Sequence, residues 1–401
     1  MSGIVVRVTL HIDTAQRRAR LAVRHGLAGA VHPGKTAEEV AADLVALHAT
    51  DPATVHLSVA ARLHRPLVAD LEAALYERRS LLRMLGMRRT MFVVPAGFAA
   101  VVQAGATRAV AAEQRRLLLK HLAETGVGDA AWLQDVSEST YEALRRRGSA
   151  TAAQLAGDEP RLRTLMVFPQ GNQYVTSRVL FLLAAEGRIV RGRPVGTWIS
   201  SQYAWSCLPD WLPEPLPELD PAAARAELAR AWLARFGPGT TADLKWWTGW
   251  TMTHTKAALR DLAAVDVSLD GGETGWVLPD DTGPVDDPGP WVALLPGLDP
   301  TVMGFQSRLW YLGPHAPALF DRTGNAGPTI WSDGRIVGGW GQQASGRVAT
   351  EFTEDVTPAV RKAVARAADE LQGWLGGVRV TPRFRAPLER KLSDVAGTVV
   401  P

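Results

Sequence analysis

The chain has 401 residues, of which 46% are hydrophobic and 21% are charged. This balance is typical of a folded globular protein and excludes a disordered chain. The length exceeds one ordinary hydrophobic core, so we expect two to four domains. The net charge is only +3, and no apolar run is long enough to cross a bilayer, which excludes a membrane-spanning helix. The first residues lack a secretory signal pattern, so we expect a soluble protein of the cytoplasm, associated with the nucleoid if it binds DNA.

Cysteine and histidine usage excludes the common metal sites. The single cysteine, Cys207, rules out a disulfide within the chain and a cysteine-based zinc site. The nine histidines show no metal-ligand spacing, and no glycine-rich stretch has the pattern of a nucleotide-binding loop. We therefore expect no metal and no cofactor. We interpret Cys207 as a buried structural thiol, because no histidine lies near it in the sequence to activate it for catalysis.

The first elements in chain order are three helices and a strand. Apolar spacing predicts a helix over Ala37–Leu47, the start of a second helix over Pro52–Leu63, and a third helix over Ala69–Leu85. The β-branched run Arg89–Pro95, bounded by proline, predicts a strand. This order of elements permits a winged-helix interpretation of the N-terminal part.

A weak internal repeat follows, in which Gly148–Leu155 resembles Pro238–Leu244 when Thr151 is aligned with Thr240. In each copy a glycine ends a first helix, a threonine caps a shorter second helix, and a third helix leads into an alternating apolar segment. The flanking elements are Trp132–Arg147, Ser177–Glu186 and Gly187–Gly192 in one copy, and Ala222–Phe236, Thr253–Ala263 and Val265–Leu278 in the other. Helix, short helix, helix and β-hairpin is the order of a winged helix-turn-helix.

The C-terminal part changes in character after a linker at Pro284–Pro290. Short strand-like runs follow, interrupted by one predicted helix at Pro358–Leu375, and Ser332–Arg335 has the pattern of a hairpin turn. The predicted strands are Trp291–Leu295, Thr329–Trp331, Arg335–Trp340 and Arg347–Thr350. This pattern indicates a small β-barrel or sheet domain, which we interpret as a scaffold.

The elements together predict an α+β fold with three tandem winged helix-turn-helix units and a C-terminal β-barrel-like domain. We place the first unit, with the catalytic element, at residues 1–115 and the second at 116–210. The third unit then covers 211–284, and the barrel-like domain covers 285–401.

Arginines occur in clusters, and their planar guanidinium suits phosphate and base-edge contacts. The clusters are Arg78, Arg79, Arg83, Arg88 and Arg89; Arg145–Arg147; Arg188, Arg191 and Arg193; and Arg379, Arg383, Arg385, Arg390 and Lys391. Solvated helix faces would explain any one cluster alone. Their recurrence at similar places in repeated units favours nucleic-acid binding.

At this point four segments resemble the winged-helix DNA glycosylases of the AlkZ and YcaQ type. The segments are Leu47–Pro52; Leu75–Met84 with Met87–Thr90; Phe236–Leu244; and Leu294–Pro300 running to Gly304 and Arg308, with Asp333–Arg335 and Gly339–Trp340 behind it. Their order and spacing cover most of the chain. The resemblance implies three winged helices around a β-barrel and excision of N-alkylated purines from double-stranded DNA, in some members including bulky natural-product adducts or crosslinks. It also implies a possible role in self-resistance to a DNA-alkylating metabolite.

The chain departs from this family at the catalytic element. The family typically has Gln-x-Gln or Gln-x-Asp just before Asp-Pro, whereas this chain has His48-Ala49-Thr50 before Asp51-Pro52. Asp51 and Pro52 suit the start of a helix, so the chain should be extended at His48–Thr50 and should project His48 and Thr50 to one face. The resemblance therefore assigns His48 and Thr50 as catalytic residues.

The chemistry expected of this pair is modest. An N7-alkylguanine or N3-alkyladenine is already cationic, so its base leaves without a strong general acid. Neutral His48 could hold the attacking water and accept its proton late, near pH 7. Thr50 could hold that water or contact the sugar-phosphate. The alternative is that His48 merely caps a helix and Thr50 enters a turn; His25, His32, His56 and His64 are then the other candidate histidines.

Other roles are assigned by position in the sequence. Arg78, Arg79, Arg83, Arg88 and Arg89 follow the catalytic element and could hold phosphates that flank the lesion. Trp246, Trp247 and Trp250 could stack on a base, but we interpret them as core residues.

We expect a monomer, because three DNA-binding units in one chain make dimerisation unnecessary. A non-catalytic winged-helix DNA-binding protein or regulator is the main alternative, and a different hydrolase that uses His48 with Asp51 is a weaker one.

Overall fold

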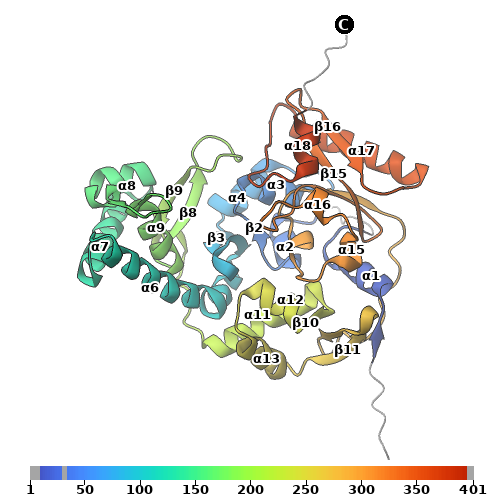
Figure 1. Cartoon of the computed structure of the whole chain (residues 1–401), viewed down its shortest axis with the longest axis horizontal. Coiled ribbons are helices and arrows are strands. Elements are labelled where there is room, and N and C mark those ends of the chain that lie inside the picture. Colours follow the sequence, from blue (N-terminus) through green and yellow to red (C-terminus); the bar gives the residue numbers. More distant parts are fainter. Residues whose placement is uncertain (1–9, 29–33, 395–401) are drawn as a thin grey trace, which may run out of the picture. The chain divides into compact units, whose positions relative to one another are not determined.

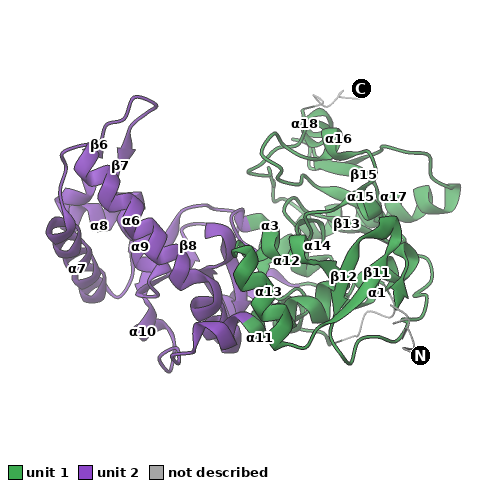
Figure 2. Ribbon diagram, turned by 60° about the horizontal axis from the view of Figure 1, so that its bottom comes forward, with its two compact units in different colours: residues 1–47, 53–66, 226–401 green, residues 48–52, 67–225 purple. Residues whose placement is uncertain are grey.

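The computed structural model describes residues 10–28 and 34–394, which form helices and several small sheets (Figure 1). The chain divides into two compact units (Figure 2). Unit 1 consists of residues 1–47, 53–66 and 226–401, and unit 2 consists of residues 48–52 and 67–225. No helix in the described ranges is long and apolar enough to span a membrane. The division at residues 115, 210 and 284 remains a prediction.

The same connectivity occurs three times along the chain: a helix, a two-residue strand, two more helices and a β-hairpin. The first copy is α2 (Ala37–Asp43), β2 (Leu47–His48), α3 (Pro52–Ala60), α4 (Val68–Tyr76), β3 (Leu81–Leu85) and β4 (Met91–Pro95). The second is α7 (Ala130–Arg147), β5 (Ala150–Thr151), α8 (Ala152–Asp158), α9 (Val175–Ala185), β8 (Ile189–Pro194) and β9 (Tyr203–Cys207). The third is α11 (Pro221–Phe236), β10 (Gly239–Thr240), α12 (Thr241–Thr248), α13 (Met252–Asp261), β11 (Val265–Leu269) and β12 (Thr274–Val277).

Strand order repeats as well as element order. The three sheets contain the runs β2-β4-β3, β5-β9-β8 and β10-β12-β11, so the short strand always pairs with the second strand of the hairpin. In the third sheet β1 (His11–Ile12) adds a parallel strand beside β11. The repeat that the sequence predicted around Thr151 and Thr240 is therefore present in the backbone.

Threonine caps explain where the short helices begin. The Thr151 hydroxyl accepts a hydrogen bond from Gln154 N at 3.2 Å, and Thr240 accepts one from Asp243 N at 3.0 Å. Both are capping boxes, because the side chain of the third helical residue returns to the backbone of the threonine. The predicted caps are confirmed at both positions.

Two predicted helices are longer than the observed ones. The first ends at Asp43 rather than Leu47, because the chain reverses through Val45 with a φ of 61°. The third ends at Tyr76, and Leu81–Leu85 is strand β3. All five side chains of β3 are buried, and each residue pairs with one of β4. Tertiary pairing therefore outweighs the helix propensity of its leucines and methionine.

Unit 2 has its own core beneath the second repeat. Leu133, Leu144 and Leu183 of α7 and α9 are fully buried in it, and Cys207 of β9 is 1% exposed. The other elements of unit 2 are α5 (Ala99–Val102), a π-helical turn (Gln103–Thr107), α6 (Arg108–Glu124), β6 (Leu165–Met166), β7 (Gln173–Tyr174) and α10 (Leu208–Trp211).

The predicted C-terminal barrel is wrong: the strands form an open four-stranded antiparallel sheet in the order β13-β14-β15-β16. Helix α17 contacts both edge strands, so a helix covers the edges that a barrel would pair. The elements of this part are β13 (Val292–Leu295), α14 (Pro300–Met303), α15 (Leu309–Leu312), α16 (Ala316–Leu319), β14 (Thr329–Ser332), β15 (Arg335–Gln342), β16 (Val348–Phe352), α17 (Pro358–Leu375) and α18 (Pro387–Ser393). The predicted strands, hairpin turn and long helix are confirmed here.

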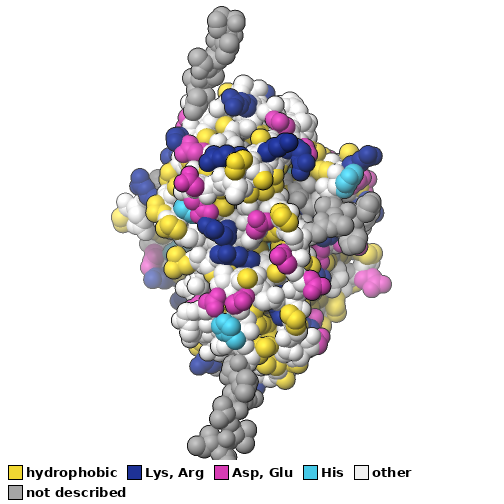
Figure 3. Space-filling view, turned by 90° about the vertical axis from the view of Figure 1, so that its right-hand side faces the viewer, with side chains coloured by type: hydrophobic (Ala, Val, Ile, Leu, Met, Phe, Trp, Pro, Cys, Tyr) yellow, Lys and Arg dark blue, Asp and Glu magenta, His cyan; other side chains and the backbone are white. Residues whose placement is uncertain are grey.

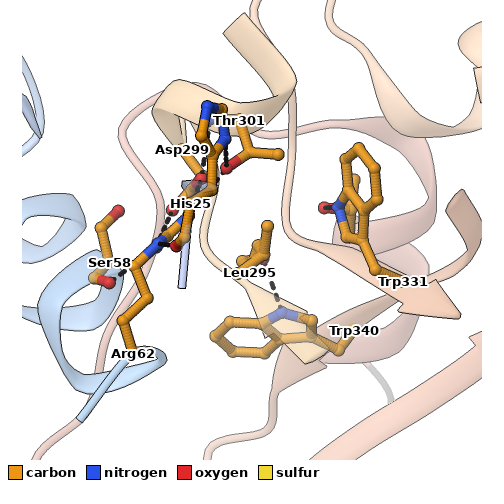
Figure 4. A network of polar contacts seen from close by, with 9 residues as sticks. His25, Ser58, Arg62, Leu295, Asp299, Thr301, Trp331 and Trp340 are labelled. Carbon is orange, nitrogen blue, oxygen red and sulfur yellow. Dashed lines mark hydrogen bonds and ion pairs between the residues drawn. The ribbon is translucent and has the colours of Figure 1, made fainter. Parts of the chain in front are cut away.

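A buried ion pair ties together three chain segments of unit 1 (Figure 4). Arg62, just after α3, forms two hydrogen bonds with Asp299 at 2.8 and 2.9 Å, and both side chains are 0% exposed. Its other donors reach the backbone oxygens of His25 and Ser58 and the hydroxyl of Thr301. His25 follows α1 (Thr14–Arg24), and Asp299 caps α14, so the pair joins the segments around residues 25 and 299 to α3.

We expect Asp299→Ala to destabilise unit 1 by about 3–5 kcal/mol, because it leaves the Arg62 guanidinium buried without its counter-charge. Urea unfolding followed by tryptophan fluorescence measures this loss. The control is Glu370→Ala, which removes a pair with Arg366 whose side chains are 77% and 72% exposed. That control should leave the midpoint unchanged. An Asp299→Ala midpoint equal to that of the wild type would show that the pair does not hold the segments together.

Candidate active site in unit 2

The candidate catalytic segment, His48–Asp51, is held extended at its start. His48 lies in β2, and the next residue, Ala49, donates its N–H to Met91 O of β4 at 2.8 Å. Arg83 Nη1 of β3 donates to Ala49 O at 3.3 Å. The backbone at Ala49 is thus bonded on both sides, and the predicted extended geometry is present at His48. Thr50 lies in a bend rather than in the strand.

His48 is buried and uncharged. Its side chain is 6% exposed, its ring packs edge-on against Phe92 at 5.5 Å, and its Nδ1 is buried with no hydrogen-bond partner among the described residues. Burial first, and then the positive charge of Arg88, lower the pKa of His48 to about 3. The imidazole is therefore neutral at pH 7, as expected. It is, however, a much weaker base than an ordinary imidazole, whose pKa of about 6.5 would suit the expected acceptance of a proton near pH 7.

Thr50 and Asp51 complete the segment. Thr50 is half-buried, and the structure records no hydrogen bond between it and His48 in the ranges that it describes. Asp51 is 7% exposed, and its negative charge adds a small contribution to the raised pKa of Tyr203, which is caused mainly by burial. The segment thus presents a neutral ring, a hydroxyl and a largely buried carboxyl group within four residues.

The turn between β3 and β4 carries two arginines, and the charge of one of them, Arg88, acts on His48. Gly86 N donates to Thr90 O at 2.9 Å and closes the turn, and Arg88 and Arg89 have φ angles of 52° and 61°. Non-glycine residues rarely adopt this left-handed conformation, which costs about 1 kcal/mol or more at each residue. The charge of Arg88 acts on His48, and the Arg89 guanidinium lies 5.7 Å from the centre of the Phe181 ring.

The other predicted DNA-binding arginines are placed differently from one another. Arg83 is only 3% exposed, so its guanidinium supports the catalytic segment and does not lie at the surface where a phosphate would bind. Arg79 donates to Trp211 O at 2.8 Å and stacks over the Trp211 ring at 4.5 Å. Arg78 is exposed, and it reaches Asp70 O at 3.4 Å.

Tyr203 of β9 lies at this site although its sequence surroundings did not predict it. Its side chain is 7% exposed, and the guanidinium groups of Arg83 and Arg191 lie 4.9 and 5.4 Å from its ring centre. Burial raises the pKa of Tyr203, so its phenol stays protonated and uncharged at pH 7. The arginine cluster that contains Arg191 was a signal for this region. Nothing in the sequence around Tyr203 pointed to His48.

The remaining candidate histidines do not form a second site. His25 is fully buried, donates or accepts a hydrogen bond with Thr301 at 2.9 Å, and has its pKa lowered well below the usual value by burial. His56 is buried in α3, and His64 is exposed. His32 lies outside the described residues. Within residues 10–28 and 34–394, no cluster of three or more metal-ligating side chains occurs.

Two of the three tryptophans predicted to be core residues are buried, whereas Trp246 is only half-buried and the Arg308 guanidinium lies 4.8 Å from its ring centre. Trp247 is 4% exposed and packs with Trp232 and Phe236 at ring distances of 6.4 and 6.2 Å, and Trp250 is 8% exposed. Burial raises the pKa of the Cys207 thiol, which favours the unreactive protonated form.

The low pKa of His48 gives a pH dependence of stability. The unfolded-state pKa of histidine is about 6.5, so protonation between about pH 6.5 and pH 3 favours the unfolded chain. This contribution is fully present above pH 6.5 and is lost as the pH falls. Compared with His48→Asn, the wild type should lose about 1.4 kcal/mol per pH unit more between pH 6 and pH 4. Urea unfolding of both proteins across this range measures the difference; parallel curves would show that His48 is not held neutral.

Comparison with known proteins agrees with this geometry. Residues 41–374 match the family described as DNA glycosylase AlkZ-like. The fold is similar to that of the DNA glycosylase AlkZ from Streptomyces sahachiroi, with a TM-score of 0.71 and 20% identity over 92% of this chain and 99% of that one. No curated protein sequence matches the chain. Because the family match covers most of the sequence, the chain belongs to the AlkZ-like family of DNA glycosylases.

Proposed function

We propose that this glycosylase hydrolyses the N-glycosidic bond of cationic N-alkylated purines, namely N7-alkylguanine or N3-alkyladenine, in double-stranded DNA. The observation that carries the proposal is the buried, neutral His48, whose pKa of about 3 prevents it from donating a proton at pH 7. A site whose histidine cannot protonate the leaving base suits a base that already carries a positive charge.

The bond changes follow from that charge. In either purine the C1′–N9 bond breaks. Its electron pair neutralises the cationic base, which leaves without an added proton. Water then forms a new bond to C1′, and the proton that it loses passes to a nearby acceptor. The products are the free alkylated base and an abasic sugar. The reaction is monofunctional, because the attacking group is water and no lysine occurs in the segment His48–Asp51.

In this proposal His48 positions the water through an unprotonated ring nitrogen. The Arg88 charge lowers its pKa, so a DNA phosphate bound at Arg88 would offset that charge and make His48 a better acceptor once DNA is present. Thr50 holds the same water or the sugar-phosphate. The carboxyl group of Asp51, next to Thr50 in the chain, would offset the positive charge that develops on the sugar.

We infer that the three copies of the helix–strand–helix–helix–hairpin connectivity are winged helix-turn-helix units that hold duplex DNA. The shared strand order β2-β4-β3, β5-β9-β8 and β10-β12-β11 supports this. The units correspond to the predicted segments 1–115, 116–210 and 211–284, with residues 285–401 as scaffold. The enzyme would act as a monomer, in the cytoplasm and at the nucleoid. Bulky natural-product adducts are the substrates to expect if it serves self-resistance.

A second candidate is a DNA-binding protein without excision activity. The specific observation in its favour is His48-Ala49-Thr50, where the family has Gln-x-Gln or Gln-x-Asp. An imidazole with a pKa of about 3 accepts a proton poorly, so the site has less catalytic capacity than the family pattern provides.

The test is excision from a duplex that contains one N7-methylguanine, followed by alkali to cleave the abasic sites. Wild-type protein should release the base and give strand breaks, whereas an unmodified duplex should give none. His48→Ala should lower the single-turnover rate by roughly 100-fold or more, and Thr50→Val by a smaller factor.

Two results separate the candidates. The His48→Ala variant should bind the duplex as the wild type does, because His48 is buried and uncharged and contributes no phosphate contact. Binding without excision by the wild type, on both N7-methylguanine and a bulky N7 adduct, would favour the non-catalytic DNA-binding protein. Full activity of His48→Ala would remove His48 from the mechanism.

A further inference from the structure

A short hairpin in unit 2 exposes an unusual number of large apolar side chains. Strands β6 and β7 pair Leu165 with Tyr174 and Met166 with Gln173. Leu165, Val167 and Tyr174 are 36%, 63% and 59% exposed, and they account for three of the nine large hydrophobic residues that are exposed among the described residues. Clustered exposure of this kind marks a binding surface more often than scattered exposure does.

The other side of the hairpin is firmly anchored. Met166 of β6 and Val175, which follows β7 as the first residue of α9, are 0% exposed and belong to the core of unit 2. Val175 N donates to Thr164 O at 3.0 Å, and Arg178 Nε donates to Gln173 Oε1 at 2.9 Å. The apolar side chains are therefore presented on a preorganised base, and the loop between β6 and β7 extends outward from the helices of unit 2 (Figure 2).

The charge around the hairpin favours an anionic partner. Residues 160–185 contain three arginines and no acidic residue; Arg161 is paired with Glu159 and Asp135, which leaves Arg163 and Arg178 as the positive charges of this stretch. By contrast, the face of the molecule in Figure 3 carries basic and acidic side chains interspersed. Arg163 is exposed, and Arg178 lies close enough to Arg89 for the two positive charges to act on each other. Two neighbouring guanidinium groups favour an anion such as a phosphate between them.

We propose that the β6–β7 hairpin is a wedge that inserts Val167 and Tyr174 between base pairs of duplex DNA while Arg89 and Arg178 hold the adjacent phosphate. Apolar side chains flanked by arginines are the chemistry with which proteins unstack a base step. This inference rests on the proposed action on duplex DNA. A second copy of the chain is a poor alternative occupant, because three side chains bury far less than the roughly 800 Å² per partner of a stable interface.

The wedge would explain how an enzyme with a weak catalytic pair gains access to its bond. Unstacking a base step costs free energy, and the cost is least at a damaged or mismatched base. A hairpin that fills the space left by the displaced base supplies part of that cost through stacking on Tyr174. The hairpin would thus favour lesions that already weaken the duplex.

The experiment measures unstacking and binding, both independent of excision. Wild-type protein is added to an otherwise unmodified duplex that contains one 2-aminopurine, whose fluorescence rises when it is unstacked. The test variant is Val167→Ser/Tyr174→Ser, and the matched control is Leu67→Ser, an apolar residue of unit 2 that is 61% exposed. Tyr174→Phe keeps the aromatic ring and should behave as the wild type.

The expected result is a fluorescence increase with wild type, Leu67→Ser and Tyr174→Phe, and loss of most of it with the double variant. The double variant should also bind the duplex roughly tenfold more weakly. An unchanged fluorescence increase in the double variant, or none with wild type, would overturn the wedge. The wedge would also be overturned if the double variant differed from the wild type in the sedimentation velocity of the free protein but not in the 2-aminopurine signal. That result would indicate that the hairpin mediates self-association. A hairpin-dependent signal without excision of N7-methylguanine would retain the wedge and reject the proposed function.

Discussion

The buried contact between Arg62 and Asp299 is the constraint on which unit 1 depends. Neither side chain is exposed, so each charge would be costly without the other. The guanidinium uses its remaining donors on His25 O, Ser58 O and the Thr301 hydroxyl, which joins segments far apart in the sequence. One of these segments is α3, which begins at Pro52, directly after the candidate catalytic residues. The chain therefore passes from the candidate catalytic segment into a helix that this ion pair anchors in unit 1.

Electrostatics in unit 2 are the basis of the proposed preference for cationic alkylated purines. Burial keeps the His48 ring neutral, and Arg88 adds a positive charge beside it. A neutral, weakly basic imidazole would neither protonate a neutral purine nor act as a strong base. In the proposed reaction it would hold water beside a base that leaves because it is already cationic. The left-handed backbone at Arg88 and Arg89 shows that the fold accepts strain to keep these charges at the turn.

The replacement of the family's glutamine by His48 need not reverse the chemistry. A glutamine side chain is neutral and offers an acceptor for hydrogen bonding, and the buried imidazole is also neutral and offers an unprotonated nitrogen. The difference lies in coupling to charge, because only the imidazole changes its basicity when a phosphate approaches Arg88. DNA binding and catalysis would then be linked through His48, which a glutamine cannot do.

The sequence by itself determined the features that depend on local chemistry. Thr151 and Thr240 mark helix starts because their hydroxyls cap the backbone, Asp51-Pro52 opens α3, and Asp333-Gly334 turns the β14–β15 hairpin. Tertiary structure alone decided that Leu81–Leu85 is a strand, since pairing with β4 outweighs helix propensity, and that α17 covers the sheet edges instead of a barrel closing. Tertiary structure also decided the burial of His48, the hydrogen bond from Arg83 to Ala49 O and the packing of Tyr203 against Arg83. These three features depend on contacts between distant segments. Neither residue spacing nor local propensity therefore encodes the low pKa of His48.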